Sequence, residues 1–343
     1  MALPYPVPRT PYSVTLRCRG GRGGRQTPPG RRRSTALPSP PRPVPDDLLQ
    51  SHGRYPFSAI VDREPYDWPG GRRLAFYVGV NLEVFSFGEG AGPELGGPKG
   101  SPDVMNYAWR DYGNRVGVWR LLDVLDDLEI PAVALANSQV LEQAPGVVEA
   151  FRERGGEVVA HGRTNAEKPG TFSERDEARL IADATDALAA GGERPLGWLA
   201  PHISESETTP DLLAEAGYEY LLDWAHDDQP VWMATRAGRL LSVPYPQELN
   251  DLPQVVHRGV TGRQFGDMVE DALGTFLREA EARPVVMGVA LHPYLMGQPH
   301  RAPHLRRALE AVRERGGDAL WATTPGAISA HVRSLDVDVP APE

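Results

Sequence analysis

Short apolar runs that end in a polar residue recur along the chain. A continuous apolar run bounded by helix-breaking residues is typical of a strand buried on both faces, and such strands belong to parallel sheets and barrels. In a parallel barrel, a reactive residue at the carboxyl end of a strand lies at the mouth of the active site. The three clearest runs cover residues 74–82, 157–160 and 284–291, and they are followed by Glu83, His161 and His292.

These runs alternate with segments of helical periodicity. Repeated strand–helix alternation predicts an α/β fold with a parallel sheet. Seven or eight such units favour a barrel, and the absence of a glycine-rich dinucleotide fingerprint argues against a Rossmann fold. Strands are predicted at residues 73–82, 132–136, 157–160, 196–200, 218–222, 240–243, 284–291 and 319–322, and helices at 115–125, 138–151, 173–190, 261–282 and 304–315, with others starting at 209 and 325.

Capping residues support several of the predicted helix starts. Ser138 is expected to cap a helix that continues through Phe151. Ser173 opens a segment that resembles a capping box, and Thr209 is followed by proline at the first helical position. Thr261 is expected to open the longest helix.

The first 45 residues differ in character from the rest. They are rich in Pro, Arg, Gly and Ser, show no periodicity, and hold nine arginines but no acidic residue. Such a segment cannot bury enough apolar surface to offset its ordering entropy. We therefore predict a disordered Arg/Pro/Gly-rich extension at residues 1–50, a barrel domain at 51–335 and a tail at 336–343.

Composition excludes several functional classes. The net charge is −10 although the first 45 residues are basic, so the body is strongly acidic and a poor general binder of nucleic acid. The single cysteine, Cys18, lies in the extension, so no disulfide is expected within the barrel. No apolar run approaches the ~18 residues that a membrane span needs, and no apolar core of a secretory signal follows the basic start. We expect a cytoplasmic protein with no membrane attachment.

Three residues at strand ends are candidates for chemistry. Glu83 follows an apolar strand, and partial desolvation there would raise its pKa toward that of a useful general base. His161 is a candidate metal ligand, with Asn165 supplying an oxygen four residues later. His292 stands before Pro293 at the end of its strand and is a candidate general acid.

Acidic clusters follow two other predicted strands. In the cluster at residues 223–228, Asp223 could orient a histidine or bond to substrate, or the cluster could be only a solvated loop. The cluster at residues 248–251 is similar. Three further histidines are interpreted as surface or helix residues, namely His52, His257 and His331.

Taken in order, these motifs resemble those of the polysaccharide deacetylase (NodB-homology) superfamily, and more closely its allantoinase-like branch. The resemblance covers roughly residues 56–332. It rests on Trp68-Pro69-Gly70-Gly71, Asn81-Leu82-Glu83, the segment 112–120, His161-Gly162, the segment 195–198, Asp223-Trp224, and Leu291-His292-Pro293 with Gly297-Gln298-Pro299.

The resemblance implies a fold, an activity and roles for particular residues. The fold would be α/β, a distorted (β/α) barrel of the NodB-homology / glycoside hydrolase–deacetylase type, and the activity would be hydrolysis of a non-peptide C–N bond. The first motif of the family supplies a catalytic base, which falls on Glu83. The last supplies an acid histidine, which falls on His292. The second supplies metal-binding histidines, of which the first falls on His161.

The chain departs from the deacetylases of this family at three positions. The deacetylases have two adjacent acids in the first motif, but here Glu83 is followed by Val84. Asn165 stands where their second motif has another histidine. The third motif has Ala200 before its proline in place of arginine. Either Glu83 and Asn165 complete a looser metal site, with zinc the metal expected first, or the enzyme works without metal, or it does not catalyse.

The first interpretation is therefore a hydrolase of linear or cyclic amides, with an N-acetylated sugar or a small ureide-like ring as substrate. The alternative is a catalytically silent barrel that binds a sugar or a small nitrogenous ligand. An RNA-associated role of the arginine-rich extension ranks last. The expected partner is a small molecule or sugar, and a homo-oligomer is compatible with the sequence.

Overall fold

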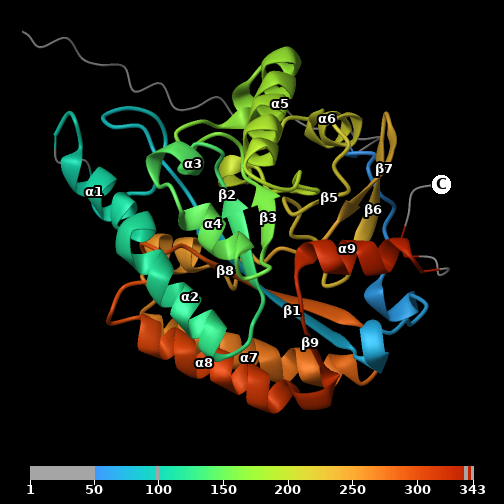
Figure 1. Ribbon diagram of the computed structural model, residues 1–343. Coiled ribbons are helices and arrows are strands. Elements are labelled where there is room, and N and C mark those ends of the chain that lie inside the picture. The colour runs from blue at the N-terminus through green and yellow to red at the C-terminus, as the bar shows by residue number, and fades with distance from the viewer. Residues whose placement is uncertain (1–50, 98–99, 336–338, 341–343) are drawn as a thin grey trace, which may run out of the picture. The chain divides into compact units, whose positions relative to one another are not determined.

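Figure 1 shows the computed structural model of the chain, of which residues 51–97, 100–335 and 339–340 are described below. These residues belong to one compact unit, Ser51–Glu343. The predicted disorder of the extension falls outside the described residues, as does most of the predicted tail, and both stay predictions. In the described part of the chain, no helix is long and apolar enough to cross a membrane.

A single sheet forms the centre of the molecule. Its strands follow the order β6-β7-β5-β4-β3-β2-β1-β8, and all neighbours are parallel except β6 and β7. The bounds are β1 (Leu74–Leu82), β2 (Ala132–Ala136), β3 (Glu157–Ala160), β4 (Gly197–Trp198), β5 (Tyr220–Leu221), β6 (Val231–Thr235), β7 (Gly238–Ser242), β8 (Val285–Leu291) and β9 (Leu320–Ala322).

Strand β1 is the most heavily paired strand. It lies between β2 and β8, and its first three residues also pair with β9 on the edge that β2 leaves uncovered. All nine of its side-chain positions are buried, as expected of a parallel strand covered on both faces. The residue that follows β1 is therefore held by a rigid element, which suits a functional site.

The sheet curls into a barrel that is incompletely closed. Strands β7 and β8 are not paired in the sheet, and an isolated parallel bridge between Asn250 and Ala290 spans the gap instead. The N–H of Ala290 donates to the carbonyl oxygen of Leu249 at 2.9 Å. This arrangement confirms the predicted distorted (β/α) barrel, and it brings the loop after β7 next to the end of β8.

Helices cover the outside of the barrel. Figure 1 shows α7 and α8 side by side along one side of the sheet. The bounds are α1 (Val104–Tyr112), α2 (Val118–Asp127), α3 (Val140–Gln143), α4 (Val147–Arg152), α5 (Glu174–Ala190), α6 (Thr209–Glu215), α7 (Gly262–Ala280), α8 (Ala302–Gly316) and α9 (Pro325–Arg333), with a π-helical turn at Gly113–Gly117 and another at Pro253–His257.

Two apolar clusters lie on the two faces of the sheet. The larger one packs the sheet against the helices and includes Leu74, Phe76 and Val78 of β1. The other fills the barrel interior and includes Ala75 and Tyr77 of the same strand. Because successive side chains of a strand point to opposite faces, odd-numbered positions of β1 face the interior. The same alternation decides which strand-end residues can meet inside the barrel.

Most predicted elements are confirmed, including the capped starts of α5 and α7. Ser173 accepts from the N–H of Asp176, and Thr261 forms a full capping box with Gln264. The single helix predicted after Ser138 is wrong. Pro145 disfavours helical geometry in the residue before it, so the segment splits into α3 and α4, and α3 starts at Val140 without a side-chain cap. Strand β6, which forms an antiparallel pair with β7, was not predicted.

Candidate active site

Strands β1, β3 and β8 are each followed by a polar residue that faces the barrel interior. Val159 of β3 and Ala290 of β8 belong to the interior cluster, so His161 and His292, two residues further on, face the same side. Glu83 lies six residues, again an even number, after the interior residue Tyr77 of β1, so it faces the same side. All three residues are buried, with exposed fractions of 5% or less. The structure therefore brings the three sequence-predicted strand-end residues together.

The carboxylate of Glu83 is the centre of this cluster. Its Oε1 lies 3.7 Å from Nε2 of His161 and 3.5 Å from Nε2 of His292. The side-chain amide of Asn165 donates to the same oxygen, and the hydroxyl of Tyr294 donates to Oε2 at 2.9 Å. The two imidazole distances exceed hydrogen-bond length, so an atom placed beside all three groups can bond to each of them.

Glu83 and His292 carry opposite charges and form an ion pair in this cluster. Burial by itself raises the pKa of Glu83, but the positive charge of His292 and the nearby imidazole of His161 outweigh it and hold that pKa well below its usual range. Burial lowers the pKa of His292, whereas Glu83 and Asp251 raise it, and the net result is a pKa of about 10. At neutral pH, Glu83 is therefore an anion and His292 a cation.

Asp251 fixes the orientation of His292. Its Oδ1 lies 2.7 Å from Nδ1 of the imidazole, and both carboxylate oxygens accept from the backbone N–H of His292 at 2.9 and 3.0 Å. Asp251 is fully buried and lies on the loop that bridges the gap between β7 and β8. The imidazolium of His292 is thus held with its Nε2–H directed toward Glu83.

The amide of Asn165 has a fixed orientation. The backbone N–H of Val84 must donate, and it does so to Oδ1 of Asn137 at 2.9 Å. The Nδ2 of Asn137 is then a donor, and it bonds to Oδ1 of Asn165 at 2.9 Å. Because its oxygen is turned toward Asn137, Asn165 presents its N–H group, and not an oxygen ligand, to Glu83.

The hydrogen bond of His161 fixes the tautomer of its ring. Its Nδ1 lies 2.7 Å from the carbonyl oxygen of Leu199, which can only accept, so Nδ1 carries the proton. In the neutral ring, Nε2 is then an unprotonated acceptor. This nitrogen is buried and has no hydrogen-bond partner among the described residues, so it is free to accept from a bound molecule.

The donor set does not fit the divalent metal site expected from the family resemblance. A three-ligand site needs two further donors beside His161 Nε2. Asn165 offers an N–H group, His292 carries a proton, and both oxygens of Glu83 already accept hydrogen bonds. Within the described residues, no group of three or more His, Cys, Asp or Glu side chains has metal-binding geometry.

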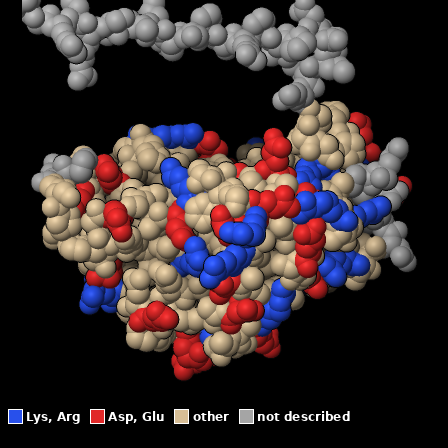
Figure 2. Space-filling model, turned by 90° about the horizontal axis from the view of Figure 1, so that it is seen from above, with Lys and Arg blue, Asp and Glu red and all other residues tan. Residues whose placement is uncertain are grey.

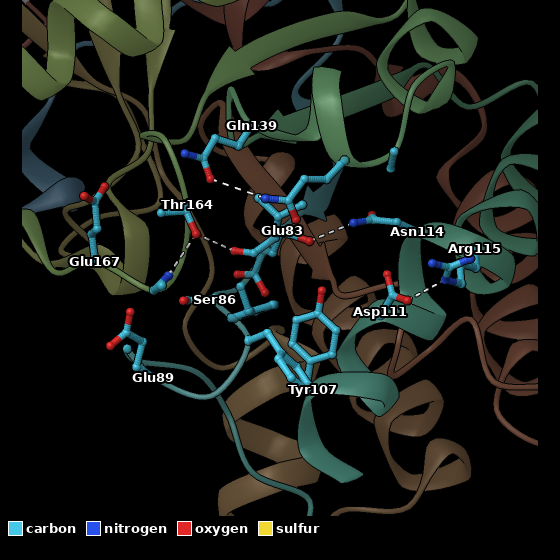
Figure 3. Close-up of a pocket in the computed structure, with 17 residues that line it drawn as sticks. Glu83, Ser86, Glu89, Tyr107, Asp111, Asn114, Arg115, Gln139, Thr164 and Glu167 are labelled. Carbon is cyan, nitrogen blue, oxygen red and sulfur yellow. Dashed lines mark hydrogen bonds and ion pairs between the residues drawn. The ribbon is translucent and has the colours of Figure 1, made fainter. Parts of the chain in front are cut away.

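Two cavities adjoin Glu83. One of about 280 Å³ contains the predicted cluster, and its wall also includes Asn81, Leu199, His202, Tyr245, Asn250 and His257. The other, of about 800 Å³, is shown in Figure 3 and lies between the loop after β1 and helix α1. In that view Asn114 bonds to the backbone oxygen of Glu83, and Thr164 bonds to that of Val84. These bonds fix the backbone from which the Glu83 side chain extends.

Sequence reasoning missed several residues of the smaller cavity. His257 was interpreted as a surface or helix residue, but it ends the π-helical turn at Pro253–His257 and lines the cavity. His202 carried no signal beyond its place after a short strand. Asp251 stood within an acidic cluster that had no assigned partner, and only the closure of the barrel brings it to His292.

Asp223 is placed differently from the other predicted site residues. Tyr220 and Leu222 belong to the interior cluster and Leu221 to the outer one, so the alternation turns Asp223 outward. Its Oδ1 accepts from the N–H of Ala200 at 2.7 Å, and its carboxyl group interacts electrostatically with that of Glu205. Asp223 does not line the 280 Å³ cavity, and its contacts support the turn after β4.

Comparison with known proteins agrees with this geometry. The family model described as "Polysaccharide deacetylase" matches residues 105–221. A protein of Schizosaccharomyces pombe (strain 972) named "Putative polysaccharide deacetylase" is 26% identical over 302 residues, which cover 82% of this chain and 91% of the relative. A "Peptidoglycan deacetylase" of Helicobacter pylori (strain 26695) is 24% identical over 207 residues, which cover 60% of this chain and 67% of the relative.

Solved structures give the same result. The crystal structure of PuuE allantoinase matches with a TM-score of 0.72 and 26% identity, covering 82% of this chain and 98% of that one. A "probable Polysaccharide deacetylase" of Pseudomonas aeruginosa PAO1 matches with a TM-score of 0.69 and 25% identity over 78% and 94% of the two chains. These matches confirm that the chain resembles the polysaccharide deacetylase (NodB-homology) superfamily. Within that superfamily, its resemblance to the allantoinase-like branch is confirmed.

Proposed function

We propose that the protein hydrolyses a non-peptide amide C–N bond, with Glu83 as general base and His292 as general acid. The observation that carries this proposal is the position of Glu83 Oε1 between the Nε2 atoms of His161 and His292 in a buried cavity. Hydrolysis of an amide requires a base, because water must lose a proton, and an acid, because the leaving nitrogen must gain one. Here the anionic Glu83 and the cationic His292 lie next to each other and can supply these two roles.

The nucleophile would be a water molecule bound by Glu83 and His161. Glu83 Oε1 accepts one of its protons, and the free lone pair on Nε2 of His161 accepts the other. The water oxygen then attacks the amide carbon as its proton passes to Glu83. Tyr294 and Asn165 hold the carboxylate in place, and the high pKa of the buried Tyr294 hydroxyl keeps it a donor.

The leaving nitrogen would receive its proton from His292. Its raised pKa keeps the imidazole charged at neutral pH, and that charge also stabilises the oxyanion of the tetrahedral intermediate. The bond from water oxygen to carbon forms, the C–N bond breaks, and the proton held by Glu83 returns to His292 at the end of the cycle. The products are a carboxylic acid, which releases its proton to solvent as a carboxylate, and an amine; the two stay joined in one molecule when the substrate is a ring.

The substrate class we favour is a small linear or cyclic amide, with ureide-like rings ahead of N-acetylated sugars. The reacting groups lie in a cavity of about 280 Å³, near the lower end of the range for small-molecule sites. The likeness to an allantoinase over 82% of this chain supports the same class. On the face seen in Figure 2, Lys and Arg side chains are interspersed with Asp and Glu, so this face offers no uniformly basic surface for nucleic acid.

A substrate panel tests this proposal. Purified protein is assayed with allantoin, hydantoin, dihydrouracil and N,N′-diacetylchitobiose, and its metal content is measured by elemental analysis. We expect turnover of at least one cyclic amide, and in His292→Ala a loss of about 100- to 10,000-fold with the fold intact. His331→Ala is the matched control, since that imidazole bonds to the backbone oxygen of Asp67 at 2.8 Å and does not line the cavity.

The other outcomes are informative in different ways. Unchanged turnover in His292→Ala would remove that residue as the acid. One zinc ion per chain that is lost in His161→Ala would overturn the metal-free scheme and favour metal-assisted hydrolysis. Binding of a panel compound without turnover would favour the silent barrel instead.

A further inference from the structure

The turn after β4 has an unusual backbone. His202 has φ of +59° and ψ of +13°, and the next residue, Ile203, has φ of +53°. Left-handed geometry is uncommon for any residue with a side chain, and for a β-branched one it is a genuine outlier. Two consecutive residues of this kind persist only where the surrounding structure holds them, and such strain concentrates at functional sites.

The turn is held from both ends. The N–H of Ile203 donates to the oxygen of Ala200 at 2.8 Å, and the N–H of Ala200 donates to the buried carboxyl group of Asp223. On the far side, the second oxygen of Glu205 accepts from the indole N–H of Trp224 at 2.8 Å. The side chains of Asp223 and Glu205 also interact electrostatically with each other. The carboxyl pair thus braces the turn that carries His202.

The strain places the His202 ring in the wall of the active-site cavity. Its Nε2 lies 2.8 Å from the backbone oxygen of Asn165, so Nε2 carries the proton. Surrounding protein lowers the pKa of His202, which keeps the ring neutral at pH 7. Nδ1 is then an acceptor, and it has no hydrogen-bond partner among the described residues. His202 is an exposed residue that lines the cavity, so this unprotonated ring nitrogen is available to a bound molecule.

Other groups in the same wall offer protons. Oδ1 of Asn250 accepts from the N–H of Leu252 at 3.0 Å, which leaves the amide Nδ2 as a donor. The hydroxyl oxygen of Tyr245 accepts from Asn81 at 3.3 Å, so its own hydrogen is available. Besides Glu83 and His161, the cavity wall thus holds one acceptor on His202 and donors on Asn250 and Tyr245, a set that can bond to an N–H group and a carbonyl group of one ligand.

We propose that His202 is a specificity-determining residue that accepts a hydrogen bond from a second N–H group of the substrate, outside the bond that is cleaved. This inference rests on the proposed function and narrows it to ureide-like substrates. An N-acetylated sugar has a single amide N–H, which belongs to the scissile group. A ureide ring has a further N–H beside a carbonyl, and it can use the acceptor and the donors together.

The test compares hydantoin with its 1-methyl and 3-methyl derivatives, because each methyl group removes one N–H. In the wild type, we expect one derivative to have a kcat/KM about 10- to 100-fold below that of hydantoin. In His202→Gly this ratio should fall to near one, with the loss on hydantoin mainly in KM. Glycine suits the left-handed backbone, so the variant should melt no lower than the wild type, which separates a lost contact from a lost fold.

Two further variants complete the test. Ile203→Gly relieves the same strain but keeps the imidazole, so it should keep the discrimination between the hydantoins. His202→Gln restores an acceptor oxygen and should recover part of it. Equal discrimination in His202→Gly and the wild type would overturn the proposal.

Binding of the same three probes by calorimetry separates this proposal from the proposed function. Discrimination in binding that is lost in His202→Gly supports the role of His202 even if no probe is hydrolysed. Hydrolysis of N,N′-diacetylchitobiose without binding of any hydantoin would support the amidase and overturn the role of His202.

Discussion

Two buried carboxyl clusters lie at the ends of barrel strands, and they differ in how their charge is compensated. At the end of β1, Glu83 faces two imidazoles and accepts bonds from Asn165 and Tyr294. After β5, Asp223 accepts one backbone N–H, from Ala200, and its charged neighbours are acids, chiefly Glu205. Burial penalises the charged form of a carboxyl group equally in both places, so the neighbours decide the protonation state.

The outcome is opposite in the two clusters. His292 and His161 outweigh burial and lower the pKa of Glu83, so the carboxylate is an anion ready to accept a proton. Burial and the neighbouring acid raise the pKa of Asp223 well above its usual value, and burial raises that of Glu205 to about 6. An oxygen of each of these two carboxyl groups has no donor among the described residues, as expected of a pair that shares one proton.

This comparison shows that an acidic residue at a strand end is not by itself a catalytic candidate. Both Glu83 and Asp223 were singled out from sequence as strand-end acids. Only Glu83 has histidine partners that keep it charged, and only Glu83 lines the cavity with them. Asp223 instead supports the turn of His202, which makes it a positioning residue in our proposal.

The largest expected effect is on turnover. Glu83→Gln keeps the size of the side chain but removes the base, so kcat/KM on the best cyclic amide should fall by about 100- to 10,000-fold. Asp223→Asn is the matched change in the other cluster. Its Oδ1 can still accept from Ala200, and kcat/KM should stay within about threefold of wild type, because a positioning residue that keeps its bond costs little. Equal losses in the two variants would contradict the contrast drawn between the clusters.

The next effect is on the pH profile. As the general acid, His292 must be protonated, so kcat/KM should hold at neutral pH and decline as the pH rises toward the His292 pKa of about 10. Asp251→Asn removes one of the two anions that raise this pKa. The alkaline decline should then move down by about one to two pH units. An unmoved alkaline limb would show that another group supplies the proton.

The smallest effect is on stability. Burial and the neighbouring Glu205 raise the pKa of Asp223 well above its usual value, so this group stabilises the protein at low pH and its contribution is lost as the pH rises through the folded-state pKa. In urea unfolding, Asp223→Asn should therefore gain stability relative to wild type at pH 8 by about 1–2 kcal/mol, and show little gain at pH 4.5. A constant difference between the two pH values would argue against a shared proton.

The class of fold and the three strand-end residues of the candidate site could be predicted from the sequence alone. Apolar runs bounded by helix-breaking residues identified β1, β3 and β8, because a strand that is buried on both faces is apolar at nearly every position. Parallel strands place their carboxyl ends at one edge, so Glu83, His161 and His292 were expected to meet. Caps at Ser173 and Thr261 located two helices because they depend only on local contacts.

Features of the site that depend on contacts between distant segments are seen only in the tertiary structure. Asp251 reaches His292 only because the loop after β7 bridges the open side of the barrel. The amide of Asn165 is oriented through Asn137, and no local pattern predicts that its N–H rather than its oxygen faces Glu83. Protonation follows the same rule, since the charge of a buried group depends on the neighbours that folding brings within a few ångströms of it.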